Sequence, residues 1–430
     1  MTMKTSTRFH ERHPAMTAVL GATALTWLFR RVRTRLFPVI LPEPTGPYDV
    51  GRIAFDWVDA RREEPYARRG HRRRELSAWL WYPAELRPGT KPGPYLPAGW
   101  RLTSLFWQFQ ASRVRAHAVP GAPVARPRAR YPVLVFSPAG FPPLYYSSLF
   151  EELASHGYIV AAVSHTYEAL PLSAFADGRL RLFRPASVGG ALKVSRASHE
   201  EDVRTRADVA RVKAEDLRSL VDELERLDAG SGVLAGRMDL TRLGAFGHSL
   251  GGNAAVELCA SDERCRAVAN LDGGVWSEAG QQGVPKPVLE LFAEHPEYVR
   301  PCDESVKQKA FASVEYCAEN RELTVDTWQR LYARARPGYS VQIRGAGHAS
   351  FTDSGLLPLR RGSLARRALG TIDGRRMWRV LSDYLRAFFD RHLQDAPAPL
   401  LEGASPSHPE GLLGPPESLF SPAPGFLTSH

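Results

Sequence analysis

The sequence has few cysteines and no internal repeat, and both features narrow the possible folds. The absence of a repeating unit excludes a solenoid or propeller. The 4 cysteines among 430 residues fall into two sequence-local pairs, Cys259 with Cys265 and Cys302 with Cys317. Their spacings match no zinc site. The pairs allow two short disulfides, which would indicate an oxidising compartment, or four thiols.

Acidic residues are in the minority, since the formal net charge is +10. Residues 1–36 hold seven basic residues and one acidic residue, so this segment carries +6 and the rest of the chain +4. No aromatic-interleaved basic surface or binding motif accompanies the charge, so nucleic acid is not an expected partner. Attraction of the N-terminal segment to a membrane surface of anionic lipid is favoured. The arginines at 68–74 are expected to form a solvated face.

The N-terminal segment at 1–45 allows several interpretations. Ala15–Phe29 is an uncharged, mostly apolar run between basic residues, shorter than the roughly 20 residues of a membrane-spanning helix. A signal peptide cleaved near Ala22-Thr23-Ala24, an interfacial helix or signal anchor, and a frayed tail all fit it. We expect the protein to be exported or membrane-associated rather than free in the cytosol.

The composition is otherwise ordinary for a globular protein, with 43% hydrophobic and 24% charged residues. Two stretches, Arg52–Val58 and Leu76–Tyr82, predict antiparallel strands. An apolar stretch at Leu102–Phe109 is a lid, a lipid-facing helix or a core-packed helix, with packing slightly favoured. From residue 131 buried-type strands alternate with helices, which predicts an α/β fold with a mostly parallel sheet covered on both faces. We predict one domain over 46–396 and a Pro/Gly-rich tail at 397–430.

The strongest local signal is Gly247-His248-Ser249-Leu250-Gly251-Gly252, a G-x-S-x-G motif between a predicted strand and a predicted helix. This context is typical of the nucleophile elbow of the α/β-hydrolase fold, where a tight turn exposes a serine. The N–H groups of the following helix favour developing negative charge. Ser249 is therefore the predicted nucleophile, and the alternative is an ordinary glycine-rich turn.

A serine nucleophile needs a base and an acid that orients the base, in the chain order serine, acid, histidine. His348 follows a predicted strand in a small-residue loop, which makes it the predicted base. Asp272 ends the strand after the elbow helix, while Glu290 and Glu294 lie on or after the next strand. Position alone prefers Asp272 over Glu294 by a small margin. Asp353 is too close to His348 in sequence to reach its far nitrogen easily.

The oxyanion hole needs two backbone N–H donors. Leu250 supplies one because it follows the nucleophile. The second comes from Ser137-Pro138-Ala139-Gly140-Phe141. Proline has no N–H, and Gly140 is the predicted donor among Ala139, Gly140 and Phe141. His165 and His248 are expected to have structural or pocket-shaping roles.

These residues together resemble the plasma-type platelet-activating factor acetylhydrolase family of serine esterases over most of 46–396. The resemblance is carried by Gly46–Gly51, Leu80–Ala84, Tyr95–Pro97, Tyr131–Ser137, Leu153–Val163, Gly247–Gly252, Asn270–Gly273, Gly347-His348 and Gly370–Asp373. In that family the acid follows the strand after the elbow helix, so the resemblance favours Asp272 over Glu294. It also implies Gly140 as the second oxyanion donor, although the family often has His-Gly or Pro-Gly where this chain has Pro138-Ala139.

The resemblance implies a 1-alkyl-2-acetylglycerophosphocholine esterase-like hydrolase that needs no metal or organic cofactor. Its expected substrates are phospholipids with short or oxidised acyl chains. A second interpretation is an esterase acting on polyesters, lactones or small soluble esters. A third is a non-catalytic, membrane-associated binding protein with a hydrolase fold, which the ordered serine, aspartate and histidine disfavour. The sequence indicates no oligomeric state.

Overall fold

The computed structural model describes residues 38–67, 72–106, 109, 111–187, 198–357, 359, 366 and 368–419. The apolar run Ala15–Phe29 and the arginines at 68 and 69 lie outside this part of the chain. None of the helices in the described ranges is long and apolar enough to cross a membrane.

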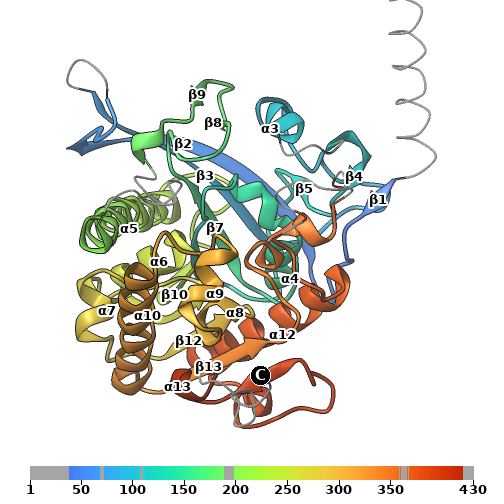
Figure 1. The fold of residues 1–430 in the computed structure, drawn as a ribbon. Coiled ribbons are helices and arrows are strands. Elements are labelled where there is room, and N and C mark those ends of the chain that lie inside the picture. Colours follow the sequence, from blue (N-terminus) through green and yellow to red (C-terminus); the bar gives the residue numbers. More distant parts are fainter. Residues whose placement is uncertain are drawn as a thin grey trace, which may run out of the picture.

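A ten-stranded sheet runs through the centre of the molecule in the order β14-β13-β12-β11-β10-β6-β7-β3-β2-β5 (Figure 1). The strands from β13 to β7 in that order pair in parallel, whereas β14, β3 and β2 run antiparallel to their inner neighbours. The predicted mostly parallel sheet of an α/β-hydrolase fold is therefore confirmed. The strands are β2 (Asp49–Glu63), β3 (Arg73–Ala84), β5 (Val119–Pro120), β6 (Tyr131–Ser137), β7 (Ile159–Ser164), β10 (Met238–His248), β11 (Cys265–Leu271), β12 (Val288–Phe292), β13 (Gly338–Ile343) and β14 (Gly411–Leu413).

Helices cover both faces of this sheet, and each face has its own apolar core (Figure 1). On one face α5 buries Leu217, Leu220 and Leu224, which are spaced at helical period. On the other face α12 buries Leu385 and Phe388. The helices are α3 (Arg101–Phe106), α4 (Ser147–Ser155), α5 (His199–Ala229), α6 (Leu250–Ser261), α7 (Glu278–Gln282), α8 (Pro296–Val299), α9 (Cys302–Lys307), α10 (Val314–Arg334), α12 (Gly374–Gln394) and α13 (Pro416–Leu419).

Two smaller strand pairs lie outside the main sheet. β1 (Val39–Ile40) pairs with β4 (Val114–Arg115), and β8 (Leu172–Ala174) pairs with β9 (Leu180–Leu182). The predicted strand at 52–58 is part of the longer β2, and the predicted strand at 76–82 is part of β3. The register pairs Ile53 with Leu80 in antiparallel orientation, as expected.

The strand order changes direction beside β6, which sets the place of the site. The chain passes from β6 to β7 on one side and then returns to β10 on the other side. In open α/β sheets, ligands bind beyond the carboxyl ends of the strands at such a point. Ser137, the last residue of β6, lies opposite Gly247 of β10. The loops after these two strands therefore meet at one edge of the sheet.

The main sheet includes one strand from the predicted tail at 397–430. Within the predicted tail, β14 pairs with β13 through Leu413 and Val341 and forms the edge of the sheet. A three-residue strand among prolines and glycines has too little alternation to be recognised from sequence.

Two further regions were left open by the sequence. The four cysteines form the disulfides Cys259–Cys265 and Cys302–Cys317. The helical part of the apolar stretch at 102–109 is α3, whose Leu102 and Leu105 are exposed. The slight preference for a core-packed helix is therefore wrong for these two leucines.

Candidate active site

Ser249 occupies a strained turn between β10 and α6. Its φ of 58° lies in the left-handed region, which costs a non-glycine residue about 1–3 kcal/mol. Two glycines make the turn possible: a Cβ at Gly247 would lie 2.1 Å from Gly251 O, and a Cβ at Gly251 would lie 2.0 Å from Ser137 O. The close packing holds a half-buried serine at the start of a helix.

His348 and Asp272 form a short hydrogen bond beside this turn. His348 begins the 3-10 helix at His348–Phe351 after β13, and its Nδ1 lies 2.6 Å from Asp272 Oδ2. Asp272 directly follows β11, and the preceding Leu271 O accepts the N–H of Ser249 at 2.9 Å. An ionised carboxylate only accepts, so Nδ1 carries the hydrogen and Nε2 stays an acceptor when the ring is neutral.

His348 lies against His248, the residue that precedes Ser249 in the turn. The His248 ring lies 4.6 Å from the His348 ring and 5.6 Å from Phe351. Its Nδ1 bonds the Tyr146 hydroxyl at 2.9 Å. Burial, with the nearby charge of His348, lowers the pKa of His248 to about 3, so the ring is neutral near pH 7. His248 is therefore placed as packing under the base, in line with its expected role.

A second histidine that the sequence did not suggest binds the same carboxylate. His295 Nε2 lies 2.7 Å from Asp272 Oδ1, and the N–H of Ala293 donates to that oxygen at 2.7 Å. The other ring nitrogen of His295 lies 2.8 Å from Glu297 Oε1. An imidazole that donates to two carboxylates must carry hydrogen on both nitrogens, so His295 is an imidazolium in this arrangement.

Asp272 and His295 shift each other's pKa values. Burial alone would lower the pKa of His295, but Asp272 and Glu297 outweigh it and raise this pKa well above its ordinary value. Burial alone would raise the pKa of Asp272, but His295 and His348 hold it well below its ordinary value. Asp272 is therefore an anion held between two rings. His295 follows β12, where Glu290 and Glu294 were the candidate acids in the sequence. Its place after that strand was the only hint of a role in the site.

The other candidate acids lie elsewhere. Glu294 points to solvent. Glu290 is buried, neither of its carboxylate oxygens has a hydrogen-bond partner within the described ranges, and burial raises its pKa well above normal. Asp353 accepts from Ser148 and Tyr95, and burial raises its pKa to about 7. The structure thus brings Asp272, and not these three, to His348.

The predicted oxyanion residues lie on the two loops that meet beside Ser249. Leu250 is the first residue of α6, so its N–H precedes the hydrogen-bonded turns of the helix. On the loop after β6, the N–H of Ala139 points to the Tyr146 hydroxyl at 3.4 Å. The carbonyl of Gly140 accepts from Leu170 at 3.2 Å, and a Cβ at Gly140 would meet no atom within 4 Å.

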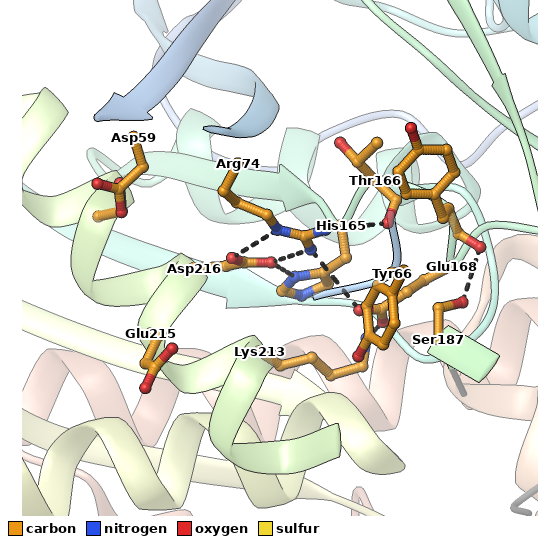
Figure 2. A network of polar contacts seen from close by, with 12 residues as sticks. Asp59, Tyr66, Arg74, His165, Thr166, Glu168, Ser187, Lys213, Glu215 and Asp216 are labelled. Carbon is orange, nitrogen blue, oxygen red and sulfur yellow. Dashed lines mark hydrogen bonds and ion pairs between the residues drawn. The ribbon is translucent and has the colours of Figure 1, made fainter. Parts of the chain in front are cut away.

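His165 lies at the same sheet edge but away from the nucleophile. Its Nε2 contacts Ser137 Oγ, and its Nδ1 contacts Asp216, both at 2.8 Å. It is buried within the group of charged side chains drawn in Figure 2. The structure therefore places His165 behind the loop after β6, residues 138–142, which is called the oxyanion loop below after its predicted role.

Comparison with known protein families identifies the family to which this chain belongs. The model of the family described as platelet-activating factor acetylhydrolase, isoform II, matches residues 41–396. The chain belongs to this family. The resemblance predicted from the sequence motifs is confirmed.

The individual relatives of this chain are distant in sequence. A platelet-activating factor acetylhydrolase of Cavia porcellus is 28% identical over 202 residues, which are 42% of this chain and 44% of that protein. A probable 1-alkyl-2-acetylglycerophosphocholine esterase of Arthroderma benhamiae is 27% identical over 59% of this chain and 65% of its own length. The chain thus matches less than two thirds of either relative.

A solved structure aligns more completely. A ferulic acid esterase from Streptomyces cinnamoneus is 31% identical, with a TM-score of 0.67 over 87% of this chain and 98% of that chain. The family member thus shares its fold with an esterase that is named for a different substrate.

Proposed function

We propose that this protein is a carboxylic-ester hydrolase that forms an acyl-serine intermediate on Ser249. The observation that carries the proposal is the 2.6 Å contact between His348 Nδ1 and Asp272 Oδ2, beside a serine held in a strained elbow. Strain of this kind clusters where a side chain must be presented to a reactant. The family and the esterase fold point in the same direction.

The proposed mechanism gives each group a step. Ser249 Oγ attacks the ester carbonyl while His348 Nε2 takes its proton, and the C–O bond of the leaving alcohol breaks as His348 returns that proton. Water then attacks the acyl-serine bond by the same route and releases the acid and free Ser249. Asp272 orients the ring of His348 and stabilises its cation. The N–H groups of Leu250 and Gly140 stabilise the oxyanion.

The proposed substrates are phospholipids with short or oxidised acyl chains. The names of the Cavia porcellus and Arthroderma benhamiae relatives support this substrate class. Exposed leucines also support it: Leu105 of α3 and Leu182 of β9 are each 73% exposed. The two elements are neighbours, since a Cβ at Gly99, just before α3, would lie 3.3 Å from Leu180. Exposed leucines on neighbouring elements suit contact with lipid.

A fluorophosphonate probe tests the mechanism. The wild-type protein should be labelled and should hydrolyse a short-acyl p-nitrophenyl ester, and Ser249→Ala should lose both properties. Ser261→Ala, at the far end of α6, is the matched control and should keep both. Labelling that persists in Ser249→Ala would assign the nucleophile elsewhere, and an unlabelled, inactive wild type would favour the non-catalytic interpretation.

A second candidate substrate is a small soluble ester, because the Streptomyces cinnamoneus neighbour is a ferulic acid esterase. The ratio of kcat/KM for an sn-2 acetyl phospholipid to that for a soluble feruloyl ester separates the two. Activity on the phospholipid that falls steeply as the acyl chain lengthens supports the first proposal. Activity confined to the feruloyl ester supports the second.

We propose an exported or membrane-associated location. The disulfides Cys259–Cys265 and Cys302–Cys317 support an oxidising compartment. The basic segment at 1–36 suits an anionic lipid surface. Sedimentation of the full chain with phosphatidylserine vesicles tests the membrane association, and phosphatidylcholine vesicles are the control.

A further inference from the structure

A second serine, histidine and aspartate are joined by hydrogen bonds behind the oxyanion loop. Ser137 Oγ lies 2.8 Å from His165 Nε2, and His165 Nδ1 lies 2.8 Å from Asp216 Oδ2. The three residues end β6, follow β7 and lie on α5. They are at most 2% exposed. No substrate reaches a hydroxyl buried to this extent, so Ser137 is not a second nucleophile.

The ionisation of this group fixes the direction of each hydrogen bond. Arg74 donates to both oxygens of Asp216, at 3.1 and 2.6 Å, and Arg62 donates at 2.9 Å (Figure 2 shows Arg74 and His165 converging on Asp216). Burial would raise the pKa of Asp216, but Arg74 and His165 hold it far below normal. Burial and Lys213 lower the pKa of His165. His165 is therefore neutral, donates from Nδ1 to the carboxylate, and accepts the Ser137 hydroxyl at Nε2.

The same group holds the backbone of the oxyanion loop. Lys213 forms an ion pair with Glu168 at 2.5 Å and donates to Pro138 O at 3.2 Å. On the other side of the loop, Gly140 O accepts from Leu170. Each carbonyl shares a rigid plane with the next N–H. The planes before and after the Ala139–Gly140 peptide are thus both held, and this fixes where the Gly140 N–H points.

The loop is also packed against the nucleophile elbow. A Cβ at Gly251 would lie 2.0 Å from Ser137 O and 2.7 Å from Pro138 O, so the backbones of the loop and the elbow touch. A displacement at Ser137 or Pro138 is therefore transmitted to the space between the two predicted oxyanion donors. A misplacement of catalytic groups by about 1 Å has large effects on the reaction rate.

Two other interpretations of the charged group are weaker. His165, Glu168 and Asp216 bring possible metal ligands within 4.8 Å of one another. However, Arg74 and Lys213 already neutralise the two carboxylates, so a divalent cation would have to displace buried ion pairs. Stability alone is also a poor explanation, because buried ion pairs gain little over apolar side chains of the same size.

We propose that Ser137, His165 and Asp216, together with Lys213, position the oxyanion loop so that the Gly140 N–H faces the tetrahedral intermediate. The proposal rests on the esterase function proposed above. These are positioning residues, since they act through the loop backbone and touch no substrate. They should matter for the transition state more than for substrate binding, because the oxyanion forms only there.

Ser137→Ala tests the proposal, since it removes one hydroxyl and leaves the backbone intact. With a short-acyl p-nitrophenyl ester, kcat should fall about tenfold, with KM within about twofold of wild type. The inhibition constant of a trifluoromethyl ketone, which forms a tetrahedral adduct, should rise by the same factor. Ser77→Ala is the matched control, because Ser77 is a buried strand serine whose hydroxyl has no partner among the described residues.

A double-mutant cycle of Ser137→Ala with His165→Gln separates positioning of the loop from a general loss of structure. If both residues act through the same series of hydrogen bonds, Ser137→Ala should add little to the loss in kcat that His165→Gln causes alone. Thermal unfolding of every variant shows which are folded. A folded Ser137→Ala with wild-type kcat and inhibitor affinity overturns the inference and leaves the proposed function intact. A wild type that neither turns over nor reacts with fluorophosphonate overturns the function itself.

Discussion

Replacing His295 with glutamine is expected to move the acidic limb of the pH–rate profile to higher pH. Glutamine keeps an N–H donor for Asp272 but has no charge, whereas the imidazole between Asp272 and Glu297 is a cation. This cation and protonated His348 bind opposite oxygens of one carboxylate, so they repel each other. Replacing His295 removes this repulsion, so the protonated, inactive form of the site should persist to a higher pH.

The magnitude follows from Coulomb's law. Two unit charges roughly 6 Å apart repel by about 3 kcal/mol at an effective dielectric constant of about 20. This energy corresponds to about two pH units. Water screens the pair, because the His348 side chain is 43% exposed. We therefore expect the pH of half-maximal kcat/KM to rise by about one unit, half of the unscreened value.

The assay is kcat/KM for a soluble short-acyl ester, measured between about pH 4 and pH 9 on wild type and His295→Gln. Glu294→Gln is the matched control, since it changes one exposed charge on the adjacent residue and should leave the limb in place. A limb that stays fixed or moves to lower pH in His295→Gln would refute the reasoning. So would an equal shift in the control.

The same cation predicts a trend in stability. The pKa of His295 is raised in the folded protein, so the folded state binds this proton more tightly than the unfolded state does. The resulting stabilisation is fully present below the ordinary histidine pKa of about 6.5 and is lost as the pH rises through the folded value. Urea unfolding should therefore separate wild type from His295→Gln most near pH 6 and less at alkaline pH. A gap that widens with pH would contradict the assignment.

Three further changes test other parts of the structure. Asp272→Asn should lower kcat on the soluble ester by about 10³-fold or more, because an amide does not stabilise the His348 cation; a loss below tenfold would move the acid elsewhere. Glu290→Gln should raise the free energy of unfolding by about 1 kcal/mol or more at pH 7, because the buried carboxyl must take up a proton on folding and the amide need not. Burial raises its pKa, so the gain should disappear below about pH 4. Gly251→Ala should destabilise the fold by about 3 kcal/mol in urea unfolding, since its Cβ would lie 2.0 Å from Ser137 O.

The sequence predicted those parts of the fold and site that have local signals. The alternation of buried strands and amphipathic helices predicted the parallel sheet, because each period is visible within a few residues. Ser249 and His348 stand in glycine-rich loops directly after strands, so their positions followed from the strands. Asp272 needed the family resemblance, because position alone preferred it over Glu294 by only a small margin.

The parts that were missed depend on contacts between distant segments. His295 reaches Asp272 because the chain turns into α8 directly after β12, and no pattern in the sequence describes that turn. β14 exists because the edge of β13 is available to it, not because Gly411–Leu413 favours a strand. Leu102 and Leu105 have the composition of core residues, and only the packing of α3 shows that they are exposed.

The two serine–histidine–aspartate sets show what residue chemistry alone does not determine. In both, the aspartate lies at the Nδ1 side of the imidazole, and both lie at the same edge of the sheet. They differ in backbone and burial: Ser249 has a φ of 58° and partial exposure, whereas Ser137 belongs to a regular strand and is fully buried. The hydroxyl of Ser137 therefore has only an internal use, and that of Ser249 is available to an ester. Because Ser137 O lies against the elbow at Gly251, the buried set is close enough to position the loop beside Ser249, as proposed above.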